Sequence, residues 1–271
     1  MVNKLLYDAA KKLQNSETPM LDARVLLSFA AGVSNSAMLF DMPDSAALDR
    51  FNEFIKMRQK GIPVHYIIGE KEFMGLTFTI NSSTLIPRPD TERLVELVIE
   101  KKYTSSPLIL DLCTGSGCIG ISLASFIPDS IVHLADISAE ALLVAEKNIA
   151  RHGLKSRVSA FRLDALNDKI KESYDIIVSN PPYIETDVLS TLEVSKTEPL
   201  LALDGGADGL DFYRSIALKS ASSLKKGGML ALEIGYNQAE SVTNLLCDDF
   251  NKIEVFKDYG GNDRVVIAYL R

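Results

Sequence analysis

The chain has 271 residues, 46% hydrophobic and 24% charged, which is enough for one large core with a smaller one beside it. Three cysteines and three histidines without metal-ligand spacing argue against a disulfide framework and a zinc site, so no metal is expected. The net charge of −7 disfavours a nucleic-acid-binding protein, and no run of about 18 apolar residues predicts a membrane span. Without an apolar signal-peptide core at the N-terminus, these features favour a cytoplasmic location.

Residues 1–71 are predicted to form a small helical bundle, because apolar residues recur there at helical spacing and no strand-like alternation appears. Thr18 followed by Pro19 predicts the N-cap and first position of a second helix, and Asp44 predicts the N-cap of a third. This part has no glycine turn and no clustered polar groups, so we predict that it docks a substrate. It also carries a short basic run, which is either a solvated helix face or a docking element: Lys56, Arg58 and Lys60.

Residues 72–86 are predicted to form a β-hairpin that links the bundle to the rest of the chain. Phe73, Phe78 and Ile80 alternate with small or polar residues around Gly75, which is typical of two short strands.

Residues 87–271 are predicted to form an α/β domain, because short apolar runs alternate with helical segments from about residue 107. This pattern indicates an open, mostly parallel sheet with helices on both faces, and such sheets bind ligands beyond the carboxyl ends of their strands. The predicted strands are 108–112, 131–136, 158–164, 174–179, 229–235, 252–258 and 264–270.

The first of these strands leads into the glycine-rich stretch "DLCTGSGCIG". Gly115, Gly117 and Gly120 satisfy the G-x-G-x-x-G pattern, which indicates either a tight strand-to-helix turn or a backbone that passes close to a nucleotide-like cofactor. Asp136 ends the next predicted strand, where a carboxylate could accept both ribose hydroxyls of an adenosine. At this point NAD and S-adenosylmethionine both remain possible.

Two carboxylates favour S-adenosylmethionine over NAD. Asp111 precedes the glycines, where it would suit the ammonium of a methionine-like ligand and repel a pyrophosphate. Asp164 ends the third predicted strand, where it could accept a hydrogen bond from an adenine amino group. An NAD oxidoreductase is therefore the weaker interpretation.

The fourth predicted strand ends in "SNPPYI", which cannot extend a sheet because neither proline donates a backbone N–H. The residue before a proline is held extended, so we expect the Asn180 amide to point outward at the strand end. The Asn180 side-chain oxygen and the Pro181 carbonyl could then accept both protons of a planar –NH2 group, with Tyr183 as an aromatic wall. A plain polar turn is the alternative. Glu233 ends a further predicted strand near this site, where it could order a loop.

"SNPPYI" together with "DLCTGSGCIG" resembles the class I S-adenosylmethionine-dependent methyltransferases that modify planar –NH2 groups. The resemblance narrows to the HemK family, the peptide chain release factor glutamine methyltransferases, through "FMGLTFTI", "LIPRPDTERLVE", "EVSKTEPLLALDGGADGLDFYR" and "GGMLALEIGYNQAE", with "DARVLL" and "PVHYIIG" in the helical part. It implies a Rossmann-like domain, and as substrate the glutamine of the release factors' Gly-Gly-Gln tripeptide.

The resemblance implies that residues 113–117 ("CTGSG") line the methionine part of the cofactor and that Asp136 binds the ribose. The glutamine would be held by Asn180, Pro181, Pro182 and Tyr183. Where some relatives have an aromatic residue after the adenine-side carboxylate, this chain has Ala165. The predicted cofactor-binding residues are Asp111, Cys113, Thr114, Gly115, Ser116, Gly117, Asp136, Asp164, Ala165 and Asn180.

The predicted reaction is in-line attack of the glutamine amide nitrogen on the sulfonium methyl group, without a metal because the leaving group is a neutral thioether. Methylation of a ribosomal-protein glutamine or of DNA adenine amino groups is chemically similar, although a DNA enzyme would need a basic groove. A catalytically silent cofactor-binding module is a further alternative, against which the intact "NPPY" argues.

Overall fold

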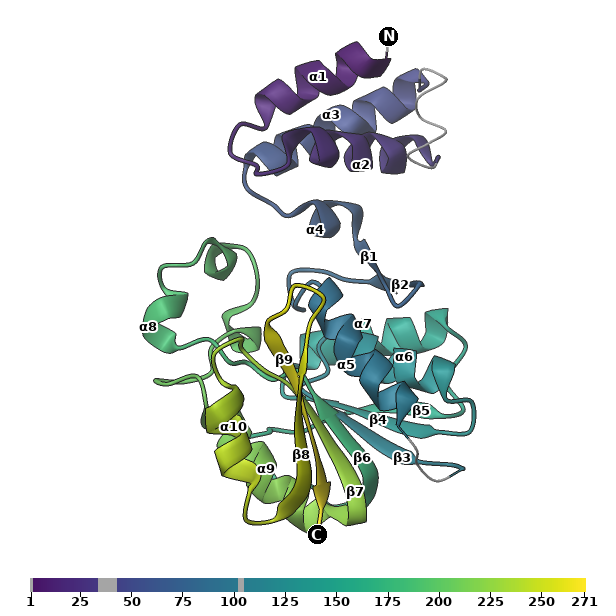
Figure 1. Ribbon diagram of the computed structural model, residues 1–271. Coiled ribbons are helices and arrows are strands. Elements are labelled where there is room, and N and C mark those ends of the chain that lie inside the picture. Colours follow the sequence, from purple (N-terminus) through teal and green to yellow (C-terminus); the bar gives the residue numbers. More distant parts are fainter. Residues whose placement is uncertain (1, 34–42, 102–104) are drawn as a thin grey trace. The chain divides into compact units, whose positions relative to one another are not determined.

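The computed structural model describes residues 2–33, 43–101 and 105–271. The chain divides into two compact units, Met1–Glu70 and Lys71–Arg271, each with its own core (Figure 1).

Helices build the first unit around a buried apolar core. In chain order they are α1 (Val2–Lys12), α2 (Pro19–Ala31), α3 (Ser45–Gln59) and α4 (Val64–Ile68). The core residues that they share include Leu6, Leu26, Leu27, Phe51 and Ile55. The helices α1 to α3 lie where the sequence predicts helices, whereas α4 was not predicted.

The helix starts in this unit test two predicted caps. Asp44 caps α3 as predicted, because its side chain accepts the Ala47 N–H over 2.7 Å. Thr18 is the N-cap residue of α2 and Pro19 begins the helix, as predicted, but the Thr18 side chain makes no capping bond: its hydroxyl donates to the Asp22 carboxylate over 3.0 Å. Asp22 also pairs with Arg58 over 2.7 Å, with both side chains largely buried, so this member of the basic run is structural.

A seven-stranded sheet forms the centre of the second unit, with the strand order β5-β4-β3-β6-β7-β9-β8. Only the β7–β9 and β9–β8 pairs are antiparallel, which confirms the predicted α/β, mostly parallel architecture. The strands are β3 (Leu108–Leu112), β4 (Ile131–Asp136), β5 (Val158–Arg162), β6 (Tyr174–Ser179), β7 (Leu224–Glu233), β8 (Phe250–Lys257) and β9 (Asp263–Leu270).

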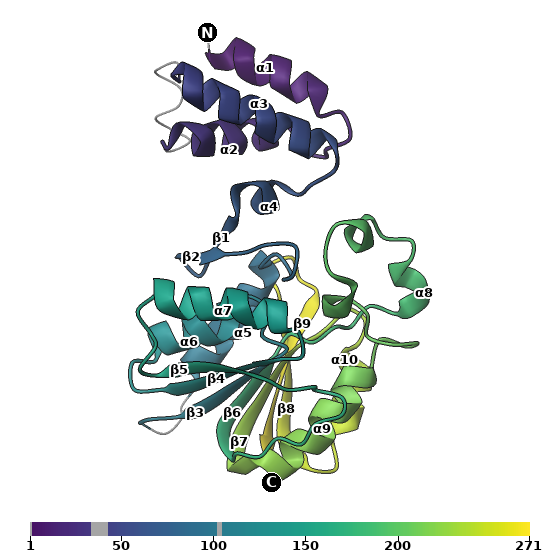
Figure 2. The same ribbon diagram turned by 180° about the vertical axis from the view of Figure 1, so that it is seen from behind.

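Helices cover both faces of this sheet, as Figures 1 and 2 show. On one face lie α5 (Pro89–Glu100), α6 (Cys118–Phe126) and α7 (Ala139–Arg151), and on the other α9 (Asp211–Ser223) and α10 (Ala239–Leu246). The central strands therefore send apolar side chains to two cores: in β3, Ile109 belongs to one and Leu110 to the other. This double burial explains why the strands read as continuous apolar runs.

A hairpin of β1 (Glu70–Phe73) and β2 (Leu76–Thr79) is fixed onto this domain. Its turn residues Met74 and Gly75 have φ angles of 52° and 71°, the two positive values that a type I′ turn requires. The buried Asn148 side chain of α7 accepts the Thr79 N–H over 2.7 Å and donates to the Thr79 carbonyl over 2.9 Å. The hairpin is thus bound to α7 by an amide that mimics a neighbouring strand.

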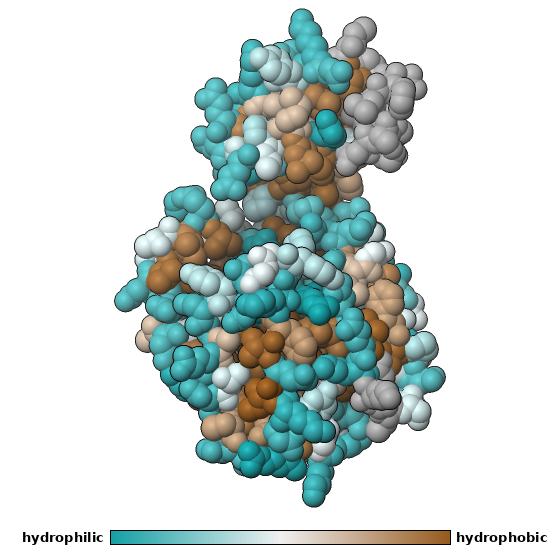
Figure 3. All heavy atoms as spheres, in the orientation of Figure 1, coloured by the Kyte–Doolittle hydropathy of each residue, from teal (hydrophilic) through white to brown (hydrophobic). Residues whose placement is uncertain are grey.

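The segment between β6 and α9 contains short helices that the sequence reasoning missed. They are α8 (Thr186–Leu189), η2 (Glu193–Lys196) and η3 (Leu200–Ala202). Figure 3 shows apolar side chains on the surface of this segment, where Val188, Leu200 and Leu201 are exposed. Within the described residues, no helix has both the length and the apolar character needed to cross a bilayer.

Candidate active site

A cavity of about 330 Å³ lies in the second unit, at the carboxyl ends of β3, β4 and β6. This is where the strand order reverses and where open α/β sheets bind ligands. Its lining contains most of the predicted cofactor residues: Cys113, Thr114, Gly115, Ser116, Asp136, Asp164, Ala165 and Asn180.

The glycines of the turn after β3 are needed for two different physical reasons, backbone conformation and close packing. Gly115 adopts a φ of 56° in open space, because an added Cβ would meet no atom within 4 Å, so here the backbone conformation favours glycine. Gly120 is required by packing, since a Cβ there would lie 2.3 Å from Leu134 Cδ2. Gly117 meets both conditions, with a φ of 82° and Ile121 Cδ1 at 2.9 Å from a Cβ. Only Gly115 thus leaves space on the cavity side.

Asp111 holds this turn from behind the cavity lining. Its Oδ2 atom accepts hydrogen bonds from the Thr114 hydroxyl over 2.5 Å and the Gly120 N–H over 2.9 Å. Its Oδ1 atom has no partner among the described residues. Complete burial raises the pKa of Asp111 to about 7, against the two hydrogen bonds. Asp111 is not among the residues that line the cavity, so its predicted contact with the methionine ammonium stays a prediction. Gly117 is not among them either, and its predicted cofactor role also stays a prediction.

Asp136 faces the cavity and also supports the turn. Its Oδ2 atom accepts the Gly115 N–H over 2.8 Å, and its Oδ1 atom accepts the Ser138 N–H over 3.0 Å. Burial raises its pKa, and these N–H groups oppose the shift. The Ile137 N–H also takes part, so at least one of the roughly four acceptor positions of this carboxylate remains for a ligand. Two acceptors side by side match the two neighbouring hydroxyls of a ribose.

Asp164 organises its own turn at the cavity edge. Its Oδ1 atom accepts the Leu166 N–H over 2.8 Å, and its Oδ2 atom accepts the Asn167 side-chain amide over 2.8 Å. The Asn167 bond is the main cause that lowers the pKa of Asp164. The proposed contact with an adenine amino group would use a remaining lone pair, and it stays a prediction.

Ala165 is buried, and its carbonyl accepts hydrogen bonds from Ser215 Oγ and Lys219 Nζ, both over 2.7 Å. Other apolar side chains, which the sequence analysis did not assign to the site, line the cavity together with Ala165. Phe212, in the first turn of α9, is the aromatic member of this set, which also contains Leu163, Leu166 and Leu201. Phe212 lies in the stretch "GLDFYR", but no local sequence feature indicates that it is close to Ala165.

The "NPPY" segment divides between the cavity and the protein interior. Asn180 and Pro182 line the cavity, whereas Pro181 and Tyr183 do not. The Asn180 side-chain nitrogen donates to the Thr91 hydroxyl over 3.2 Å. Burial raises the pKa of Tyr183 to about 12, and the nearby Glu233 carboxylate adds to the shift. The predicted substrate contacts of these residues stay predictions.

The segment 204–209 ("DGGADG") packs so closely against the "NPPY" segment that two of its residues must be glycine. A Cβ on Gly205 would lie 2.7 Å from Tyr183 Cα, and one on Gly209 would lie 2.5 Å from the Tyr183 carbonyl oxygen. Gly205 also donates its N–H to the Ile184 carbonyl over 2.8 Å. The Gln238 side chain donates to the same Tyr183 carbonyl over 3.0 Å. The glycines of "DGGADG" are thus structural supports of the site, a role that the sequence reasoning did not assign.

Glu198 joins the two loops that border the cavity. Its buried carboxylate accepts the Ile86 N–H over 3.0 Å and pairs with the Arg88 guanidinium. Arg88 and Pro87 line the cavity from the loop before α5, and Pro199 lines it from the segment after η2. We therefore regard this ion pair as a clasp between two walls of the cavity.

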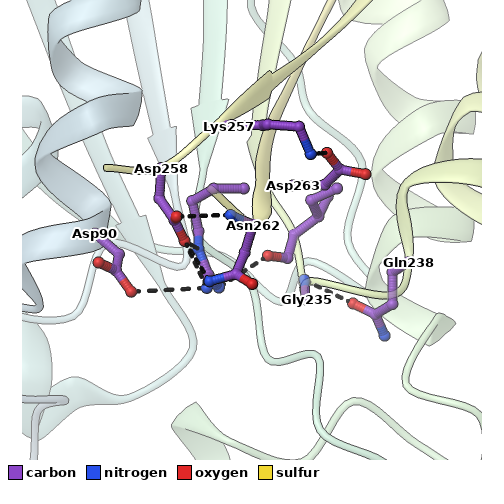
Figure 4. A network of polar contacts seen from close by, with 9 residues as sticks. Asp90, Gly235, Gln238, Lys257, Asp258, Asn262 and Asp263 are labelled. Atoms are coloured by element: carbon purple, nitrogen blue, oxygen red, sulfur yellow. Dashed lines mark hydrogen bonds and ion pairs between the residues drawn. The ribbon is translucent and has the colours of Figure 1, made fainter. Parts of the chain in front are cut away.

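A polar network fixes the ends of β7 and β9 behind the site (Figure 4). Arg264 pairs with Asp258 over 3.1 Å and with Asp90 over 3.6 Å, and it donates to the Ile234 carbonyl over 3.2 Å. The Gln238 side chain turns back to accept the Gly235 N–H over 2.9 Å. The network therefore holds the chain immediately after Glu233.

Comparison with known proteins gives two family matches and many close relatives. The family model "Methyltransferase small domain" matches residues 90–197, and "PrmC N-terminal domain" matches residues 4–69. The chain is 41% identical to the release factor glutamine methyltransferase of Clostridium acetobutylicum, over 95% of this chain and 93% of that protein. It is also 41% identical to that of Moorella thermoacetica, over 100% of this chain and 99% of that protein. The chain belongs to the family of release factor glutamine methyltransferases.

A solved structure agrees with this family at the level of the fold. A methyltransferase from Pyrococcus furiosus has a TM-score of 0.54 and 17% identity, over 73% of this chain and 91% of its own. In this member of the release factor glutamine methyltransferase family, the matched span 90–197 contains the glycine turn, Asp136 and "NPPY", whereas Phe212 and Glu233 lie beyond it.

Proposed function

We propose that this chain transfers a methyl group from S-adenosylmethionine to the side-chain amide nitrogen of the glutamine in the Gly-Gly-Gln motif of peptide chain release factors. Membership of the family supports the reaction class, and the family's named substrate supports the choice of protein. A cytoplasmic location goes with this substrate.

The cavity fits the proposed methyl donor. The Asp136 carboxylate, which faces the cavity, suits the ribose hydroxyls, and the open face above Gly115 allows the methionine part to approach the backbone. Thr114, Ser116 and Cys113 would surround that part, while Ala165 and Phe212 would border the adenine. When bound, S-adenosylmethionine supplies an electrophilic methyl group on a positively charged sulfur.

The observation that carries the proposal is the orientation of the Asn180 amide. Because its nitrogen donates to Thr91, its oxygen is the group that remains for a substrate. This oxygen would accept one proton of the glutamine –NH2, and the Pro181 carbonyl would accept the other. Two acceptors at fixed positions orient the nitrogen lone pair toward the methyl donor, which lowers the entropic cost of a reactive geometry.

No general base is assigned to this reaction. The amide nitrogen becomes acidic as it is alkylated, so water can take its proton. The work of Asn180 and Pro181 is therefore orientation and the stabilisation of positive charge that develops on the nitrogen. We further propose that residues 1–71 recognise the release factor, because the cavity and its lining lie wholly in the second unit and leave this helical unit, matched at residues 4–69 by its own family model, without a part in the chemistry.

The decisive experiment combines radiolabelled S-adenosylmethionine with the full chain and purified release factors, followed by mass-spectrometric mapping of the labelled residue. A release factor with the motif glutamine replaced by alanine is the control substrate. Label at the motif glutamine, lost in the control, supports the proposal. Label instead on a ribosomal-protein glutamine or on DNA, offered in parallel reactions, would replace it with one of the chemically similar alternatives.

A further inference from the structure

Glu233 is a buried carboxylate at the end of β7, next to the proposed substrate site. Only 2% of its surface is exposed, and its Oε2 atom has no partner among the described residues. The β6–β7 register pairs Ser179 with Leu232, so Glu233 follows in register with Asn180 at the same edge of the sheet. Burying a carboxylate without full hydrogen bonding costs free energy, so this position suggests that Glu233 has a function.

Three side chains from separate elements meet at this edge. The Thr91 hydroxyl of α5 and the Asn180 amide both lie near enough to Glu233 to lower its pKa by hydrogen bonding. Asn180 also donates to the Thr91 hydroxyl over 3.2 Å. Because the Thr91 hydroxyl accepts from Asn180, its own proton remains for the carboxylate.

This arrangement distinguishes the two ends of the Asn180 amide. A side-chain amide can turn by half a rotation and exchange its oxygen with its nitrogen at little steric cost. An ionised carboxylate only accepts hydrogen bonds, so it stabilises the orientation that presents –NH2 and opposes the one that presents oxygen. Resting on the proposed function, we infer that Glu233 is a positioning residue that, through Thr91 and directly, keeps the Asn180 oxygen toward the substrate amide.

The charge on Glu233 makes this role dependent on pH. Burial raises its pKa to about 7, with Asp90 adding to the shift and Thr91, Arg264 and Asn180 opposing it. The Glu233 charge also acts on Tyr183, Tyr213 and Cys118, since it contributes to the raised pKa of each. Above this pH the carboxylate is ionised and accepts from Asn180. Below it the protonated carboxyl carries its own donor and no longer selects one amide orientation.

The test uses the full-length chain with Glu233→Gln, which keeps the shape and removes the charge. Glu240→Gln, at an exposed position in the first turn of α10, is the matched control. The first readout is the side-chain amide resonance of Asn180 in a ¹⁵N-labelled sample without cofactor, assigned by its loss in Asn180→Asp. We expect this resonance to shift between about pH 5.5 and 8.5 in the wild type and Glu240→Gln, and to lose that step in Glu233→Gln.

The second readout is the methylation rate of a release factor at saturating cofactor. We expect the kcat of Glu233→Gln to fall about tenfold or more at pH 8, with cofactor affinity within about threefold of the wild type. If Glu233→Gln does not fold, Thr91→Val replaces it, since this change removes the bridging hydroxyl.

The outcomes separate the two proposals. An Asn180 resonance with the same pH step in Glu233→Gln, or a kcat within threefold of the wild type, overturns the positioning role. An Asn180 resonance that depends on Glu233 in a wild-type chain that does not methylate release factors supports the positioning role and contradicts the proposed function.

Discussion

The Gly115 N–H donates to Asp136 Oδ2 over 2.8 Å, so one carboxylate supports the glycine turn and faces the cavity at the same time. A change at Asp136 should therefore act on both the turn and the ligand.

Asp136→Ala is expected to weaken binding of S-adenosylmethionine. The variant loses the carboxylate proposed to accept from the ribose and the bond that holds Gly115, a loss of about 1–3 kcal/mol, or roughly five- to 150-fold in affinity. Titration calorimetry measures this. Asp129→Ala, at an exposed position in the loop after α6, is the control, and unchanged affinity in Asp136→Ala would contradict the assignment.

Asn180→Ala is expected to leave cofactor affinity largely intact and to slow methylation about a hundred- to a thousandfold, as for the loss of an orienting hydrogen bond in a closed site. Asn180→Asp should be equally poor, because its carboxylate would face that of Glu233 and could not donate to Thr91. Single-turnover assays at saturating cofactor measure both. An Ala variant within threefold of the wild type would exclude the orienting role.

Asp111 should make the stability of the fold depend on pH. Its pKa is raised from 3.8 to about 7 in the folded chain, so the folded state binds more protons than the unfolded state between these values. Burying the charged form costs free energy, so the contribution of Asp111 to the free energy of unfolding falls as pH rises from about 4 to about 7.

Asp111→Asn removes this step while its amide can still accept from Gly120. Its stability relative to the wild type should increase over that window by more than about 1 kcal/mol. Denaturant titrations of both chains at several pH values give the difference between their free energies of unfolding. Glu233 also has a raised pKa, but it contributes equally to both chains and cancels in this difference. A difference that does not vary with pH would falsify the prediction.

Glu198→Gln is expected to open the clasp between the two walls of the cavity. The variant can still accept the Ile86 N–H but loses the charge that pairs with Arg88. Limited proteolysis between residues 185 and 210 should become at least about fivefold faster. Glu193→Gln, which breaks an exposed ion pair with Lys196 in the same segment, should leave the rate unchanged. Equal rates in the two variants would show that the clasp does not hold the segment.

A chain that begins at Glu70 keeps β1 and the complete second core. We expect it to bind cofactor with wild-type affinity but to methylate intact release factor at least about tenfold more slowly, because binding surface away from the reacting atoms is lost. Full activity in this truncation would rule out a docking role for the helical unit.

Periodicity was sufficient to predict the sheet, because the central strands, such as β3 and β6, are short apolar runs that two cores bury. The residues at the strand ends could also be predicted, since a chain that leaves a sheet needs turn chemistry that is visible locally in Gly115 and Asn180. Contacts between distant segments were not predictable. Nothing near Gly205 or Gln238 indicates that both support Tyr183, and the N-cap position of Thr18 does not reveal that its hydroxyl donates to Asp22.

The pairing of Glu198 with Arg88 also bears on the order in which the protein can mature. The two residues are 110 positions apart, so the wall that Glu198 anchors is missing until most of the chain has left the ribosome. A nascent chain that ends before Glu198 already contains the glycine turn and Asp136, yet it lacks the carboxylate that joins the two walls of the cavity. This long-range contact can therefore form only late in synthesis.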